Sequence, residues 1–422
     1  MSMADRPEGS DSLFRLTEQE EMVQQMVRQW CERTLLPKVP AMESGELEPW
    51  GLMREFARTF GLDHMAASGV KKRVARLRDA GPEGDAREDM FSGAGGSPLL
   101  GYVVVKELSR ISPGFAMGWG VSVGLAGGAI VAKGTPDQIE RWGLPIVKME
   151  KVASWCLTEP SAGSDAFGSM KTVARPHGDG YVLSGSKTFI TNGPGADLFV
   201  VYARIDRGEP RAEQPVATFV LERGMPGFSQ GKPFKKMGMR DSPTCELFFE
   251  DVPVPAANLL GGKEKGAGGR RDVKESLGNE RSGVPAMAWG IIERCYDQTR
   301  KYVLEREQFG KPIAEFQAVQ LKIADMYIKL RNVENLVFRL AWQQKHGIRD
   351  LALINASKAY AAQMCIDVAL TAIQCHGGYG YMEEYHLEKL ARDAKLLELG
   401  AGTTDINLLT AARHELGIGG HG

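Results

Sequence analysis

The feature that most limits how this chain can fold is the spacing of its apolar residues, which changes twice along its 422 residues. Up to about residue 150, and again from about residue 272, apolar residues recur every three or four positions, as on amphipathic helices. Between about 155 and 262 they occur in short alternating runs separated by Gly, Asp and Pro, which is typical of strands. The sequence therefore predicts an α+β chain with an N-terminal all-α domain (1–154), a middle antiparallel β-barrel or sandwich (155–265) and a C-terminal four-helix bundle (266–422).

Composition narrows the class of protein. A net charge of −1 gives no reason to expect a nucleic-acid partner. The N-terminus lacks an apolar segment, and no apolar run looks long enough to span a bilayer. The six cysteines are scattered without a C-x-x-C pair, so we expect no metal site and a cytoplasmic, reduced protein.

Local signals place the first helices. Thr17 and Glu20 form a capping-box pattern, and Thr135 with Pro136 is a helix start. The segments 50–60, 99–109 and 113–133 read as helices. The basic residues between 71 and 78, and the Gly/Ser/Pro-rich stretch that follows to residue 98, are interpreted as an irregular surface excursion.

The remaining elements are predicted from period and turn signals. Hairpin turns are expected at 179–180 and 184–187. Expected strands are 171–174, 180–184, 188–191, 198–204, 217–221 and 245–249. Expected bundle helices are 272–306, 316–346, 350–376 and 404–416.

Residues 155–165 stand at the boundary between the first helical part and the strands. Pro160 and Gly163 shape the backbone, and short polar side chains surround them. Backbone N–H groups outside a regular ladder can bind a flat, polar, anionic ligand, so this loop is a candidate ligand site. Its Glu159 and Asp165 are interpreted as residues that hold the loop, not as catalytic acids.

Six motifs in this order and spacing resemble the acyl-CoA dehydrogenase family, over essentially the whole chain except around 70–98 and 262–272. They are Thr158-Glu-Pro-Ser-Ala-Gly-Ser-Asp165, Leu183-Ser-Gly-Ser-Lys-Thr-Phe-Ile-Thr-Asn-Gly193, Phe249-Glu-Asp-Val-Pro-Val-Pro255, Arg306-Glu-Gln-Phe-Gly-Lys-Pro-Ile313, Gln374-Cys-His-Gly-Gly-Tyr-Gly380 and Arg392-Asp-Ala-Lys395. The resemblance implies FAD as cofactor, an acyl-CoA substrate, an electron-transfer flavoprotein as acceptor, and a homotetramer built through the bundle.

The resemblance also implies which residues contact the cofactor, some of them across a subunit boundary. Phe189 stands where Trp is common in the family, and either ring can stack on a flavin. The alternative for Phe189 and Phe309 is core packing, and for Arg306 a surface ion pair. The implied FAD-binding residues are Trp155, Leu157, Thr158, Gly163, Ser164, Phe189, Ile190, Thr191, Arg306, Gln308, Phe309, Phe316, Gln317, Gln374, Gly377, Gly378, Thr403 and Asp405. The implied substrate-binding residues are Ser164, Arg281 and Gly402.

The catalytic base is where this chain departs from the common family pattern. Many members carry Glu before Gly-Thr, but here the matching position is Ala401, which keeps only its backbone N–H for a role in catalysis. Glu280 lies on an otherwise apolar helical stripe, where burial would raise the pKa of a carboxyl group. The isovaleryl-CoA dehydrogenase branch places its base directly before this Arg and has Gly-Ala-Gly-Thr in the later segment. We therefore predict Glu280 as the general base, with an exposed or Arg281-paired Glu as the alternative.

The resemblance thus implies FAD-dependent α,β-dehydrogenation of a short or branched acyl-CoA. Three alternatives stay open. One is a flavin oxidase or monooxygenase on the same fold. Another is a dehydrogenase that acts on acyl groups bound to a carrier protein. The third is an inactive flavin-binding homologue, in which Ala401 marks the loss of the catalytic base.

Overall fold

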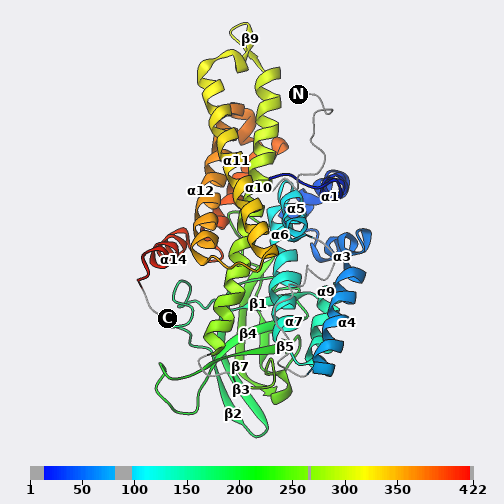
Figure 1. The fold of residues 1–422 in the computed structure, drawn as a ribbon, viewed down its shortest axis with the longest axis vertical. Coiled ribbons are helices and arrows are strands. Elements are labelled where there is room, and N and C mark those ends of the chain that lie inside the picture. The colour runs from blue at the N-terminus through cyan, green and yellow to red at the C-terminus, as the bar shows by residue number, and fades with distance from the viewer. Residues whose placement is uncertain (1–13, 81–96, 265–267, 419–422) are drawn as a thin grey trace.

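The computed structural model describes residues 14–80, 97–264 and 268–418. A long helical bundle rises from one end of a curled β-sheet, and the N-terminal helices lie along one side of both (Figure 1). The predicted order of helical, β and helical parts, and with it the α+β class, is confirmed.

Helices and turns make up the N-terminal part as far as residue 147. Thr17 Oγ1 accepts a hydrogen bond from Glu20 N at 3.3 Å, and the Glu20 carboxylate accepts one from Thr17 N at 2.8 Å, so the predicted capping box is confirmed. Thr135 and Gln138 form a second one. The elements are α1 (Glu18–Trp30), η1 (Cys31–Leu35), η2 (Leu36–Lys38), α2 (Val39–Ser44), α3 (Trp50–Thr59), α4 (Leu62–Ala80), α5 (Pro98–Ser109), α6 (Pro113–Trp119), η4 (Gly120–Gly127), α7 (Gly128–Lys133), α8 (Pro136–Gln138), η5 (Ile139–Gly143) and α9 (Leu144–Val147).

Two sequence interpretations in this part were wrong. The basic segment 71–78 is the second half of helix α4, because Ala67, Val70 and Val74 recur at helical spacing and are buried. The second concerns the expectation that no apolar run is long enough to span a bilayer. By length and composition alone, the continuous helix Pro113–Lys133 is long and apolar enough to do so. However, 67% of that apolar window is buried inside the protein, as in the core helix of a globular fold.

The middle part is a seven-stranded sheet in the order β1-β4-β2-β3-β7-β6, with β5 paired to β4. Most pairs are antiparallel as predicted, but β1 and β2 both run parallel to β4. They pair with successive stretches of β4, so the loop between them leaves the sheet and returns to it. The strands are β1 (Ala153–Cys156), β2 (Val173–His177), β3 (Gly180–Thr191), β4 (Leu198–Ile205), β5 (Val216–Glu222), β6 (Phe228–Gln230) and β7 (Thr244–Pro255); η6 (Ala256–Asn258) follows.

The hairpin predicted at 184–187 is a bulge inside one long strand, β3. Gly185 has φ +142°, and an added Cβ would lie 2.7 Å from Thr172 Cα. Glycine is thus needed here for close approach of two strands and not for a turn. The turn predicted at 179–180 is confirmed between β2 and β3.

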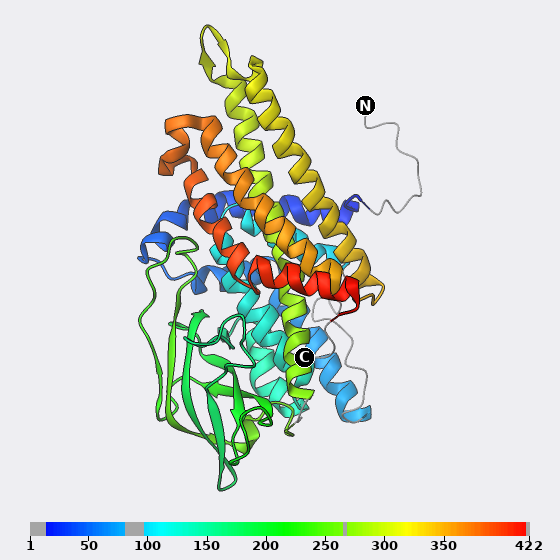
Figure 2. The ribbon, with the colours of Figure 1, turned by 90° about the vertical axis from the view of Figure 1, so that its left-hand side faces the viewer.

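Long helices form the C-terminal part, and four of them match the predicted ranges within a few residues. Helix α13 was not predicted. Figure 2 shows α14 crossing the base of the bundle above the sheet, while the β8–β9 hairpin lies at the opposite tip. The elements are α10 (Gly268–Glu305), β8 (Glu307–Gln308), β9 (Lys311–Pro312), η7 (Ile313–Glu315), α11 (Gln317–Lys345), α12 (Leu351–His376), η8 (Gly377–Tyr381), η9 (Glu383–Tyr385), α13 (Leu387–Leu399) and α14 (Thr404–Leu416).

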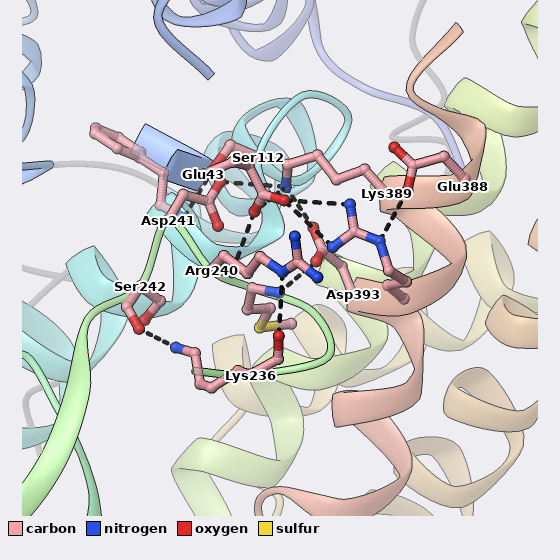
Figure 3. Close-up of polar contacts among 12 residues, drawn as sticks. Glu43, Ser112, Lys236, Arg240, Asp241, Ser242, Glu388, Lys389 and Asp393 are labelled. Atoms are coloured by element: carbon pink, nitrogen blue, oxygen red, sulfur yellow. Dashed lines mark hydrogen bonds and ion pairs between the residues drawn. The ribbon is translucent and has the colours of Figure 1, made fainter. Parts of the chain in front are cut away.

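A buried polar cluster joins the three parts, and Figure 3 shows it as sticks. Lys389 of α13 lies 3.2 Å from Asp241 of the middle part and also pairs with Asp393. Asp241 accepts a hydrogen bond from Ser112 at the start of α6, and Asp393 accepts one from Met239 N. We call Ser112, Met239, Asp241, Lys389 and Asp393 the three-domain junction.

Candidate active site

The loop after β1 is held in place by a buried ion pair. Glu159 accepts hydrogen bonds from Lys187 Nζ at 2.8 Å and from the backbone N–H groups of Lys171 and Thr172 at 2.6 and 3.0 Å. Burial opposes ionisation of Glu159, but Lys187 and these donors outweigh it and lower the pKa of the carboxyl group. Asp165 accepts bonds from Gly168 N and Ser169 Oγ. The loop-holding roles predicted for Glu159 and Asp165 are confirmed.

The same loop is bonded to the end of strand β3, so the two segments implied for the flavin ring lie together. Thr188 N donates to Thr158 O at 2.9 Å. Ser154 Oγ, on β1, donates to Thr191 O at 2.9 Å. Leu157 is buried and its carbonyl accepts from Lys187, whereas Gly163 and Ser164 are exposed. We call residues 155–165 and 189–191 the shelf.

Trp155 and Phe189 differ in how firmly the shelf holds them. Trp155 donates from Nε1 to Tyr202 OH at 3.0 Å. Phe189 is 68% exposed at a β-bulge with φ +58°, and its ring centroid lies 5.8 Å from that of Phe234. Core packing is therefore excluded for Phe189, whereas its neighbour Ile190 is buried. An exposed aromatic ring on strained backbone is typical of a ligand contact.

A second strained segment follows α13. Ala401 and Gly402 have φ +55° and +85°, and we call residues 401–403 the turn. Arg281 Nε donates to Ala401 O at 3.1 Å. Thr403 caps α14 by accepting a bond from Ile406 N, and Asp405 is exposed in the first helical turn. The sequence had assigned Arg281 to the substrate; the structure shows its contact with the turn.

A pocket of about 470 Å³ lies beyond the end of helix α10, at the far end of the bundle from the turn. Five residues implied for the adenine and pyrophosphate line it together: Arg306, Gln308, Gln374, Gly377 and Gly378. An added Cβ at Gly377 or Gly378 would meet nothing within 4 Å, so a ligand can approach the backbone here. The structure thus brings together residues that are up to 72 positions apart in sequence.

The aromatic residues beside this pocket are also presented outward. Phe309 is 94% exposed with φ +54°, so core packing is excluded for it too. Phe316 packs edge-on against it at 6.0 Å, and Gln317 is exposed at the start of α11. Arg306 makes no ion pair with any residue in the described ranges and lies 5.9 Å from the Tyr379 ring, so the surface ion-pair alternative has no support.

Sequence reasoning missed the other six residues that line this pocket, which are Tyr302, Ile313, Cys375, His376, Tyr379 and Met382. The His376 ring stacks on Tyr302 at 4.2 Å, and its Nδ1 lies 2.8 Å from Ala372 O. Burial lowers the pKa of His376. Its buried Nε2 has no hydrogen-bond partner within the described part of the chain, which leaves one acceptor at the pocket unused. The signal was present, since His376 lies inside the quoted Gln374–Gly380 motif.

Within one chain, the pocket lies far from the shelf and the turn. Arg281 and Arg306 are 25 residues apart along and just beyond helix α10. At about 1.5 Å per residue, this separates them by roughly 37 Å. The side chain of Glu280, the predicted base, lies outside the described part of the structure, although its position falls within α10.

Comparison with known proteins covers nearly the whole chain. The models "Acyl-CoA dehydrogenase, N-terminal domain", "middle domain" and "C-terminal domain" match residues 17–150, 154–252 and 267–416. A short-chain-specific acyl-CoA dehydrogenase from Clostridium acetobutylicum is 34% identical over 94% of this chain and 97% of its own length. The chain belongs to the acyl-CoA dehydrogenase family.

Other relatives agree with this membership. The mitochondrial isovaleryl-CoA dehydrogenase of Pongo abelii is 34% identical over 96% of this chain and 90% of its own. The solved butyryl-CoA dehydrogenase of Megasphaera elsdenii superposes with a TM-score of 0.83 at 32% identity, covering 96% of this chain and 99% of that one. The resemblance drawn from the six motifs, the isovaleryl-type branch included, is confirmed.

Acyl-CoA dehydrogenases are FAD-dependent flavoprotein oxidoreductases, and the residues of this chain fit that cofactor. The exposed Phe189 ring offers a surface for a flat ring system. Arg306 offers a planar fork for phosphate, and the open glycines beside it let a pyrophosphate approach the backbone. The donor-rich shelf and the pocket therefore match the two ends of a dinucleotide.

Proposed function

We propose that this chain removes the α-proton and β-hydride from a short or branched acyl-CoA thioester, with Glu280 as the general base. The observation that carries the proposal is the contact of Arg281 with Ala401 O. Arg281 directly follows Glu280, so this contact draws the helix that carries the base against the turn where other family members place theirs. Val284 and Met287, on the stripe predicted to include Glu280, are buried.

The roles of the protein groups follow from the charge that develops. Glu280 takes the α-proton, and the backbone N–H of Ala401 donates to the thioester oxygen as enolate charge builds on it. Bound FAD would supply the acceptor for the β-hydride. Gly400 and Ala401 leave room beside the β-carbon, which suits a branched acyl group. Ser164, Arg281 and Gly402 contact the substrate.

The test replaces the base and follows flavin colour. Glu280→Gln is expected to keep FAD bound and to slow anaerobic bleaching by acyl-CoA by at least about a thousandfold, because an amide cannot accept the α-proton. The readout is stopped-flow absorbance against a panel of straight, branched and cyclic acyl-CoAs. Glu305→Gln, an exposed change on the same helix, should bleach like wild type.

Unchanged bleaching by Glu280→Gln would reject this base. No bleaching of the wild type by any thioester would favour the inactive homologue. Rapid reoxidation by O₂ in place of transfer to an electron-transfer flavoprotein would favour the oxidase alternative. Bleaching only by carrier-bound acyl groups would change the substrate class.

We also propose that FAD is held between subunits of a homotetramer. The support is the roughly 37 Å of helix between turn and pocket, which is more than one dinucleotide spans. A partner's bundle tip would bring its pocket to this chain's shelf. Co-expression of a variant disabled at the shelf with one disabled at the pocket should restore some active sites, whereas a monomeric site would give none.

All six cysteines are free, which suits a reduced, cytoplasmic enzyme.

A further inference from the structure

The turn is bonded by side chains from three separate helices. Arg281 of α10 donates to Ala401 O at 3.1 Å. Lys358 of α12 donates to Gly402 O at 2.6 Å. Asn407 of α14 donates to Gly402 O at 2.8 Å and to Thr403 O at 2.9 Å. Three successive carbonyl groups are therefore fixed from outside the turn.

Fixing the carbonyl groups of Ala401 and Gly402 also fixes the N–H groups that follow them in the chain. In a trans peptide the carbonyl oxygen and the following N–H point in opposite directions. The bonds to Ala401 O and Gly402 O therefore aim the N–H groups of Gly402 and Thr403 away from the three helices. Neither they nor the N–H of Ala401 has a hydrogen-bond partner among the residues that the structure describes.

The backbone would not hold this shape unaided. Ala401 carries a Cβ at φ +55°, a conformation that costs an L-residue about 1–2 kcal/mol. A turn without outside contacts would relax toward negative φ at this residue and rotate its N–H. The contacts from Arg281, Lys358 and Asn407 oppose that relaxation.

Holding the turn with a buried lysine, Lys358, costs free energy. Its side chain is fully buried, and burying an ammonium group carries a desolvation penalty that an apolar side chain of similar length avoids. One helical turn earlier on α12, Asn355 accepts a bond from Arg281 Nη1 at 3.0 Å and so orients the residue that holds Ala401 O. Helix α12 thus supports the turn at two points.

We propose that Lys358 is a positioning residue for the reaction. By holding Gly402 O it keeps the turn, and with it the left-handed φ of Ala401, in the shape in which the backbone N–H of Ala401 meets the thioester oxygen. This inference rests on the proposed function, in which that N–H stabilises the enolate. Lys358 touches neither substrate nor cofactor in this role; it acts through the turn.

The test compares Lys358→Met with Lys106→Met, which removes another fully buried lysine, on α5 and remote from the turn. With equal FAD content, Lys358→Met should reduce anaerobic flavin reduction by acyl-CoA at least about tenfold, since losing one oxyanion donor costs about 10²–10³. Lys106→Met should stay within about twofold. Asn407→Leu, which removes the second donor to Gly402 O, should act in the same direction as Lys358→Met.

Two readouts separate positioning from general damage. The infrared carbonyl band of bound, isotope-labelled 2-butenoyl-CoA should lose part of its red shift in Lys358→Met but not in Lys106→Met. Adding Ala401→Gly to Lys358→Met should recover part of the rate, because glycine adopts positive φ without strain. A crystal structure of Lys358→Met should show residue 401 outside the left-handed region.

The outcomes distinguish this inference from the proposed function. If the wild type bleaches normally and Lys358→Met matches Lys106→Met in rate and carbonyl band, the positioning role is rejected. If no acyl-CoA bleaches the wild type, the proposed function fails, and the crystal structure of the variant alone decides whether Lys358 holds the turn. An undisplaced turn in that crystal structure overturns the inference in either case.

Discussion

The three-domain junction and the cofactor-facing segments use polar and aromatic residues in opposite ways. At the junction, Lys389 is buried between Asp241 and Asp393, and a backbone N–H and a hydroxyl also donate to these carboxylates. On the shelf and beside the pocket, Phe189 and Phe309 stand exposed on left-handed backbone. The first arrangement holds three domains in register. The second leaves aromatic rings exposed for a ligand, on backbone conformations that cost free energy.

The largest expected effect is at the junction. Lys389→Met leaves Asp241 and Asp393 buried without their cation, so the free energy of unfolding should fall by about 3–5 kcal/mol. Urea denaturation of the holoenzyme measures it. Lys329→Met, which removes a partly exposed pair with Asp325 and Asp367 on the bundle surface, should cost no more than about 1 kcal/mol. Equal losses would contradict the contrast between the two regions.

The junction should also leave a mark on the pH dependence of stability. Burial raises the pKa of Asp393 to about 6. The folded state therefore keeps a proton that the unfolded chain releases near pH 4, so stability from this group is present below that pH and is lost as pH rises from about 4 to about 6. Relative to Asp393→Asn, the wild type should lose about 2–3 kcal/mol across this window. If the free energy of unfolding changes with pH equally in the two proteins, Asp393 does not titrate in this window.

A change in the pocket should spare stability and weaken cofactor binding. Arg306→Ala removes an exposed side chain, so the free energy of unfolding of the FAD-free protein should change by less than about 0.5 kcal/mol. The dissociation constant for FAD should rise at least about tenfold, because a charge-assisted contact to phosphate is lost. Fluorescence titration of the FAD-free protein measures it. Arg300→Ala, an exposed change six residues earlier, should leave FAD affinity unchanged.

The smallest expected effect is at the turn. Ala401→Gly removes a Cβ from φ +55° and should raise the free energy of unfolding by up to about 1 kcal/mol. Ala411→Gly, inside helix α14, should lower it by about the same amount, since glycine is unfavourable in a helix. Opposite changes in the free energy of unfolding would show strain at the turn. A lower free energy of unfolding in both variants would show that the turn is relaxed.

Sequence patterns predicted the elements whose signals are local. The capping box at Thr17, the helix start at Thr135 and the long bundle helices follow from short-range chemistry, and the motif residues of the pocket follow from the family resemblance. Prediction failed where distant contacts decide. The basic residues in the second half of α4 were interpreted as a surface loop, and α13 begins without a side-chain N-cap that the sequence could reveal. Gly185 was interpreted as a turn because only the neighbouring strand at Thr172 reveals the close approach.

The sequence by itself determined the family, the cofactor and the chemistry that Ala401 cannot perform, because these depend on which side chains are present and in what order. The tertiary structure decided how the turn is held. Lys358 and Arg281 lie 44 and 121 positions from Gly402, and nothing in the spacing connects them. A carbonyl group attracts any donor that packing brings near, so a role carried by backbone atoms is visible only when the helices are in place.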